Sequence, residues 1–194
     1  MQEQLDHNLF LRSERRTSYV LRFVLAALAA GFGLIALLGW IAGFPLLTTF
    51  ATGKIPMAPS TAMLFLLHGT AVFCYVRMPQ RPGAQRLGLV FGGSGTVVTL
   101  LLLVLSLRGI HPAIEHLGLR ITGTVDGVPI GHMSPLTALC FMLAGLSFLA
   151  LLSSSDRRWR PGAALALASL VVLTSIAILL AYLLGLPLLY GSGV

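Results

Sequence analysis

The chain has 194 residues, of which 56% are hydrophobic and only 10% are charged. This composition excludes an ordinary soluble domain and predicts a membrane protein whose first partner is the lipid bilayer. The formal net charge of +7 does not indicate nucleic-acid binding, because the basic residues gather in short groups beside apolar segments.

Five apolar stretches are long enough to cross a bilayer as helices, which takes about 20 residues. In chain order, we expect helices at 19–44, 59–76, 87–107, 135–152 and 163–186. Residues 1–18 form a polar tail, which we expect to be partly helical and to lie along the membrane surface. The predicted fold class is therefore all-α, with a polytopic helical domain at residues 19–194.

The basic residues predict the orientation of these helices. Ten of the thirteen lie in the tail and in every second loop, and such loops face the cytoplasm. We therefore expect the N-terminus in the cytoplasm. The ten residues are Arg12, Arg15, Arg16, Arg22, Arg77, Arg81, Arg86, Arg157, Arg158 and Arg160.

One thirteen-residue segment occurs twice in the chain. Residues 57–69 read MAPSTAMLFLLHG and residues 133–145 read MSPLTALCFMLAG, with seven identical positions. Each copy opens an apolar run, and two predicted crossings separate the copies. We therefore expect a helix pair that is used twice in the same orientation, as a parallel repeat.

The repeated residues have physical roles at a helix start and on a helix face. Proline suits the first helical position, where its missing N–H costs no hydrogen bond, and Ser134 is expected to cap the second copy. Thr, Phe and Gly follow at intervals of four residues, so they share one face, and small residues on such a face let helices approach closely. The predicted packing residues are Pro59, Thr61, Phe65, Gly69, Pro135, Thr137, Phe141 and Gly145.

The end of the chain is similar to the approach to the first copy. Residues 183–194 (LLGLPLLYGSGV) and residues 37–47 (LLGWIAGFPLL) both begin with Leu-Leu-Gly and both contain Pro-Leu-Leu. A third copy with a sixth helix is therefore expected directly after Val194. On this view the chain is either part of a longer protein or a shortened, five-helix form of it.

His68 is the one ionisable side chain predicted midway along a membrane helix. Such a group is costly in the bilayer and is a candidate functional residue. The second copy has Ala144 at the equivalent position, so the repeat itself does not require the histidine. The alternative is a neutral histidine that bonds to a neighbouring hydroxyl or carbonyl.

The longest predicted loop, residues 108–134, collects further polar side chains. His111, Glu115, His116, Asp126 and His132 all lie there. The candidate ligand-binding residues of the chain are therefore His68, His111, His116, Asp126 and His132, and the alternative is a polar cap over the helix ends. His111 and His116 are five residues apart, which does not suit two metal ligands on one helical face, so we assign no metal, and the sequence leaves the cofactor unknown.

The pattern Met-x-Pro-x-Thr-Ala-x-x-Phe-x-Leu-x-Gly at residues 57–69 and 133–145 resembles the repeated helix starts in the N-terminal membrane regions of bacterial sensory histidine kinases and diguanylate cyclases. The resemblance implies a multi-helix sensory or anchoring module in the bacterial inner membrane. The chain has no phospho-acceptor histidine motif, no ATP-binding box and no GGDEF sequence. We therefore expect no enzymatic activity from it.

Three functions are consistent with these observations. The first is a non-catalytic sensory module that transmits a periplasmic or intramembrane stimulus by helix repacking. The second is a structural accessory subunit whose glycine and alanine faces bind helices of a second copy or of a larger membrane complex. The third, a small transporter, has the least support, because His68 is the only Asp, Glu, Lys, Arg or His residue predicted in the middle of a span.

Overall fold

The computed structural model describes residues 2–49, 56–78, 81–110, 112–119, 121, 123–125, 128–152 and 159–184. Five α-helices occur in these residues, and all five are long and apolar enough to cross a membrane, which confirms the prediction of five apolar helices. Their bounds are α1 (Gln2–Ala42), α2 (Pro59–Arg77), α3 (Pro82–Leu107), α4 (Pro135–Leu152) and α5 (Arg160–Leu183). Four short elements join them: η1 (Pro45–Leu47), η2 (Ala113–His116), β1 (Thr124–Val125) and β2 (Val128–Pro129).

The observed helix bounds differ from the expected ones mainly at the N-terminal ends. α3 and α5 begin earlier than residues 87 and 163, because Pro82 and Pro161 can stand in a first helical turn without losing a hydrogen bond. α1 shows the largest difference, since it continues through the polar tail as one helix of 41 residues. Its apolar part begins at Arg16.

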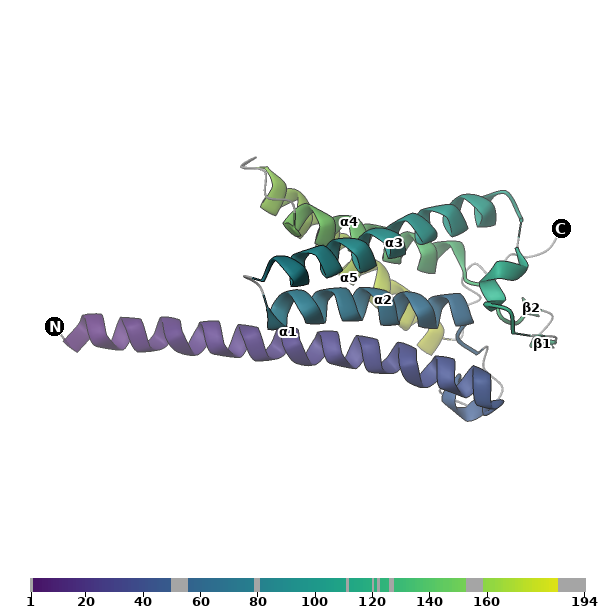
Figure 1. Cartoon of the computed structure of the whole chain (residues 1–194), viewed down its shortest axis with the longest axis horizontal. Coiled ribbons are helices and arrows are strands. Elements are labelled where there is room, and N and C mark those ends of the chain that lie inside the picture. Colours follow the sequence, from purple (N-terminus) through teal and green to yellow (C-terminus); the bar gives the residue numbers. More distant parts are fainter. Residues whose placement is uncertain are drawn as a thin grey trace.

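Each α-helix packs mainly against the helices next to it in the chain, in the order α1, α2, α3, α4, α5. Figure 1 shows the N-terminal half of α1 extending well beyond the bundle. The same view places the end of α2 and the start of α3 at the end of the bundle nearer this extension. The short strands and η2 lie at the opposite end (Figure 1).

A core of apolar side chains joins α2, α3 and α4 near the end that carries η2. Its buried members are Ala58, Leu64, Leu102, Met133, Ala138 and Phe141. The two phenylalanines of the repeated segment meet here, because the rings of Phe65 and Phe141 lie edge to face with centroids 4.9 Å apart. Such aromatic pairs stabilise packing beyond the burial of their surface. The repeated segments thus contact each other directly.

The contact between α1 and α2 depends on a missing side chain. A Cβ atom on Gly69 would lie 2.5 Å from the backbone nitrogen of Ala30 and 2.9 Å from its Cα. No side-chain rotation relieves an overlap with backbone atoms. Gly69 therefore permits the close approach of α1 and α2 that small residues provide in membrane helices.

Candidate functional site

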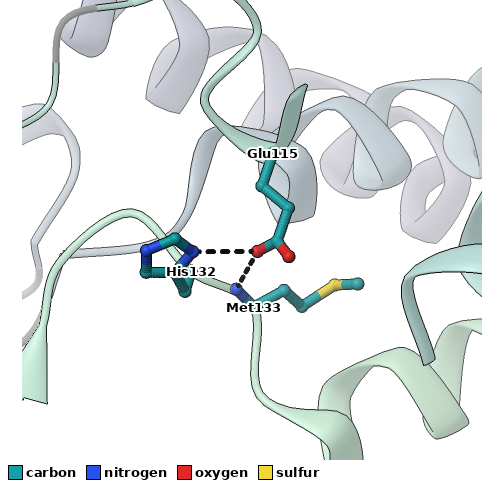
Figure 2. Close-up of polar contacts among 3 residues, drawn as sticks. All are labelled: Glu115, His132 and Met133. Atoms are coloured by element: carbon teal, nitrogen blue, oxygen red, sulfur yellow. Dashed lines mark hydrogen bonds and ion pairs between the residues drawn. The ribbon is translucent and has the colours of Figure 1, made fainter. Parts of the chain in front are cut away.

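Three polar side chains of the long loop meet at one point, which Figure 2 shows in part. Glu115 is only 2% exposed. Its Oε2 atom accepts a hydrogen bond from the backbone N–H of Met133 at 3.0 Å and lies 3.4 Å from His132 Nδ1 (Figure 2). The ring of His116 lies beside that of His132, with centroids 4.8 Å apart. We call Glu115, His116, His132 and the Met133 amide the loop cluster.

Local backbone geometry brings the two parts of the loop cluster together. η2 carries Glu115 and His116, and it stops at Leu117, which takes a left-handed conformation with φ 51°. The chain returns through β1 and β2, which pair antiparallel with Val125 opposite Val128. Gly131, with φ +91°, then turns the chain so that His132 and Met133 reach Glu115. A glycine suits this turn because a positive φ strains other residues.

Gly131 also lets the His116 ring lie close to the backbone of the turn. A Cβ atom on Gly131 would lie 3.1 Å from both Cδ2 and Nε2 of His116, so the ring packs against the backbone of this turn. His116 Nε2 is buried and has no hydrogen-bond partner among the described residues. Burial lowers the pKa of His116 from its ordinary value of 6.5, the neighbouring His132 lowers it further, and Glu115 acts in the opposite direction.

The loop cluster holds the start of α4. Met133 stands two residues before Pro135, the first residue of α4, and its own side chain is buried in the apolar core. The N–H of Thr137 donates to Ser134 Oγ at 3.2 Å, so the serine caps the helix as the sequence predicts. The loop cluster, the cap and the core therefore fix three consecutive residues, 133–135, at the point where the loop becomes a helix.

His68 lies apart from the loop cluster, on α2 where α3 and α4 converge. Its Nδ1 atom lies 3.0 Å from the carbonyl oxygen of Leu64, one helical turn earlier. A Cβ atom on Gly145 would contact Thr96 Oγ1 and lie 2.9 Å from His68 Nε2, and a Cβ on Gly95 would lie 2.6 Å from His68 Cε1. We call His68, Gly95, Thr96 and Gly145 the three-helix junction.

One nitrogen in the three-helix junction lacks a partner. A neutral histidine that donates from Nδ1 to the Leu64 carbonyl keeps an acceptor lone pair on Nε2. That atom is buried without a hydrogen-bond partner among the described residues. The Thr96 hydroxyl donates instead to the carbonyl of Gly92 at 2.7 Å. The contact with the Leu64 carbonyl fits the interpretation of His68 as a neutral histidine bonded to a neighbouring group. This contact uses Nδ1 and leaves Nε2 unused.

The structure brings together two of the five candidate ligand-binding residues, His116 and His132. His68 is separate, and His111 and Asp126 lie outside the described residues. Sequence reasoning left Glu115 out of the candidate set, although it is the residue that joins the others. The sequence signal for Glu115 was its acidic side chain in a loop between two apolar helices. Within the described part of the chain, no three His, Cys, Asp or Glu residues could hold a metal ion.

The residues of the repeated segment have distinct roles in the two copies. Pro59 and Pro135 are the first residues of α2 and α4. Thr137 bonds to Ser134 through both its backbone and its side chain, whereas the first copy has Ala58 at the cap position and no side-chain cap bond. Thr61 is buried at the start of α2.

The sequence analysis also missed the polar side chains of α3. Thr96 and Thr99 are buried and return their hydroxyl hydrogens to the carbonyls of Gly92 and Gly95. Such local bonds satisfy a hydroxyl in an apolar setting. Nothing in the spacing of these threonines distinguishes them from other polar residues of the helix, so only the structure identifies the buried ones.

No model of a protein family, no curated protein and no solved structure matches this chain.

Proposed function

We propose that this chain is a non-catalytic sensory and anchoring module of a bacterial signal-transduction protein, inserted in the cytoplasmic membrane with its N-terminus inside. The five apolar helices supply the membrane anchor. The basic residues of the tail and of the 77–86 and 157–160 segments support the orientation. In this orientation the loop cluster faces the periplasm and the long extension of α1 enters the cytoplasm (Figure 1).

The observation that carries this proposal is the bond between Glu115 Oε2 and the Met133 amide. It ties η2 to Met133, two residues before the start of α4, across 18 positions of the chain. α4 in turn packs along α3 and α5. A change in the loop cluster therefore acts on the start of a helix that crosses the whole bundle.

Signalling by this route requires two packings of α4 that are close in free energy and that a stimulus stabilises unequally. The contacts along α4 suit such a change because several depend on small or polar groups. Gly145 contacts Thr96 of α3, and Ser147 Oγ donates to the carbonyl of Ala164 in α5 at 2.8 Å. A small shift of α4 would exchange these contacts without exposing a large apolar surface.

We also propose that α2 and α4 are equivalent members of a parallel helix-pair repeat. The glycines support this, since Gly69 faces α1 and Gly145 faces α3, in each case the preceding helix of the chain. The prolines support it as well, because each begins the second helix of its pair. A repeat in one orientation explains why the Met57 and Met133 ends of the pairs both follow loops on the side assigned to the periplasm.

A distance measurement between the cytoplasmic ends of two helices tests the sensory proposal. Spin labels are attached at Arg77→Cys on α2 and Trp159→Cys before α5, two exposed positions, with Cys74 and Cys140 replaced by alanine. Electron–electron double resonance in lipid nanodiscs then compares Glu115→Ala with Ile114→Ala, a control at an exposed residue of the same η2 helix.

We expect Glu115→Ala, and not Ile114→Ala, to change the distance distribution between residues 77 and 159. If both variants give the unsubstituted distribution while remaining folded, the loop does not act on the far ends of the helices. The sensory proposal then fails.

The exposure of α5 favours a second function, that of a structural accessory subunit. α5 packs on α4. Among the described side chains of α5, only Ala164 is buried. Its remaining apolar surface faces lipid or the helix of a partner. Mass measurement of the chain purified in a mild detergent separates these functions, because an accessory subunit would be recovered with its larger complex and a self-sufficient module would not.

A further inference from the structure

The loop cluster places one carboxylate and two imidazoles around a single backbone amide. Glu115 is buried, His132 Nδ1 lies 3.4 Å from its carboxylate, and the His116 ring is 4.8 Å from the His132 ring. A single carboxylate can balance the charge of one imidazolium, and a second imidazolium finds no second anion within this set. The number of protons that the cluster holds therefore decides whether its charges attract or repel.

We propose that the loop cluster is a proton-responsive latch. In its closed form Glu115 holds the Met133 N–H at the start of α4, and in its open form, reached when His116 becomes protonated, this hydrogen bond is broken. The inference names the stimulus of the sensory module and so rests on the proposed function. The proton is the ligand, and it requires no cavity. Histidine is the side chain whose ordinary pKa lies closest to physiological pH, and both histidines stand outside the helices assigned to the membrane.

A proton on His132 would strengthen the latch. Protonated His132 would pair with the Glu115 carboxylate at 3.4 Å, and the carboxylate would still accept the Met133 N–H. The pair is neutral in total charge. A charge-assisted bond of this kind is stronger than a neutral one.

A proton on His116 weakens the latch. Protonated His116 stands beside His132, and its buried Nε2 becomes an N–H donor with no acceptor among the described residues. Burying a charge without a partner is costly, and the cost disappears when the ring swings out to water. The ring packs against the Gly131 turn, so its departure loosens the segment that holds His132 and Met133 beside Glu115.

The direction of the pH dependence follows from the lowered pKa of His116. The closed latch binds a proton at His116 less readily than the open latch, in which the His116 pKa returns toward 6.5. The closed form is therefore fully stable above that pH, and it loses stability as the pH falls through the lower pKa of the closed form. Acidification opens the latch.

Few other charged groups adjoin the latch. η2 supplies Glu115 and His116, and the segment before α4 supplies His132. The start of α2, which packs on η2, has no ionisable side chain in residues 59–67. At the end of α3 the nearest cation in sequence is the exposed Arg108, and the loop residues His111, Arg120 and Asp126 lie outside the described part of the chain.

The first copy of the repeated segment provides an internal control. Met57 corresponds to Met133, and its N–H donates to the backbone carbonyl of Thr48 at 2.8 Å. That carbonyl does not titrate in this range. An effect of protons on the latch should therefore reach the Met133 amide and leave the Met57 amide unchanged.

Nuclear magnetic resonance of the full chain, labelled with [15N]methionine, tests this inference, because only six methionines occur in the sequence. The amide signals of Met57 and Met133 are followed from about pH 8 to pH 5, the range in which histidines titrate. Opening removes the bond from Met133 to the carboxylate and moves its amide proton upfield. We expect this transition at a pH below 6.5, with no matching change at Met57.

Three variants assign the transition. His116→Gln should abolish it, because the side chain whose protonation opens the latch is then missing. His132→Gln should move its midpoint upward toward 6.5, because the like charge beside His116 is removed. His7→Gln lies in the first turns of α1, whose N-terminal half extends away from η2 (Figure 1), and it should leave the midpoint unchanged.

The outcomes separate this inference from the proposed function. A Met133 signal that does not move, or that moves together with Met57, overturns the latch, and the effect of Glu115→Ala on the 77–159 distance still decides the sensory proposal. A Met133 transition without a pH-dependent change in that distance supports the latch and contradicts signalling through α4. Both changes at one midpoint support the latch and the module together.

Discussion

The two copies of the repeated segment begin with the same residue, held in different ways. The Met57 N–H donates to a backbone carbonyl, that of Thr48, and the Met57 carbonyl accepts from the indole of Trp40 at 2.8 Å. The Met133 N–H donates to the buried carboxylate of Glu115. The first acceptor is a neutral backbone carbonyl, and the second is a side-chain carboxylate. The comparison teaches that two helix starts with similar sequences can be held by chemically different acceptors.

The two copies also differ along their helices. In the first copy, Gly69 meets the backbone of Ala30 and is preceded by His68. In the second, Gly145 meets the side chains of Thr96 and His68, and Ala144 precedes it. One interface is therefore fixed by backbone atoms and the other by side chains that can rotate. We therefore expect substitutions at the two interfaces to differ in how far a second substitution can relieve them.

The largest effect is expected from Gly69→Ala. The new methyl group overlaps the backbone of Ala30, and overpacking of this kind costs about 1–3 kcal/mol or more. Gly145→Ala should also destabilise the fold, but Thr96→Ala should restore much of the loss, because the overlap involves the Thr96 side chain. Thermal unfolding in detergent measures these differences.

Gly31→Ala is the matched control, because a Cβ atom there would meet nothing within 4 Å. It should change the melting temperature little. If Thr96→Ala fails to relieve Gly145→Ala, the α3–α4 interface is as rigid as the α1–α2 interface. The distinction between the two copies would then be wrong.

The second prediction compares the two attachments of the repeated methionines. Glu115→Ala leaves the Met133 N–H without its charged acceptor, and hydrogen bonds to charged groups contribute about 1.5–3 kcal/mol. Trp40→Phe removes a neutral bond to the Met57 carbonyl, worth about 1 kcal/mol. Denaturation followed at pH 7 should rank Glu115→Ala as the more destabilising change, and the reverse order would show that the carboxylate is not the stronger attachment.

The sequence could predict the helices better than the loop cluster, for a physical reason. Helix length, apolar composition and the prolines at positions 59 and 135 are local properties, and they anticipated α2 and α4 closely. The meeting of Glu115 with Met133 depends on the left-handed turn at Leu117 and on Gly131, and therefore on the path of the whole loop. The identity of the buried acceptor could not be read from the spacing of the histidines.

The third prediction concerns the capping difference. Ser134→Ala removes the oxygen that accepts the Thr137 N–H, and loss of such a cap costs about 0.5–2 kcal/mol. The equivalent position in the first copy already has alanine, without a side-chain cap bond. Amide exchange at the first turn of α4 should therefore increase in Ser134→Ala toward the rate in α2. An unchanged exchange rate would show that the loop cluster alone fixes the start of α4.

The smallest effect is expected at His68. His68→Leu removes an Nε2 acceptor that has no partner in the described part of the chain, and replacing a buried polar group by an apolar group of similar size can be nearly neutral. His68→Ala should be more destabilising, since it leaves a cavity beside Gly95 and Gly145. The same unfolding measurement compares the two variants. If His68→Leu destabilises as much as His68→Ala, the polar atoms of the ring rather than its volume stabilise the three-helix junction, and the first copy depends on a polar side chain where the second has Ala144.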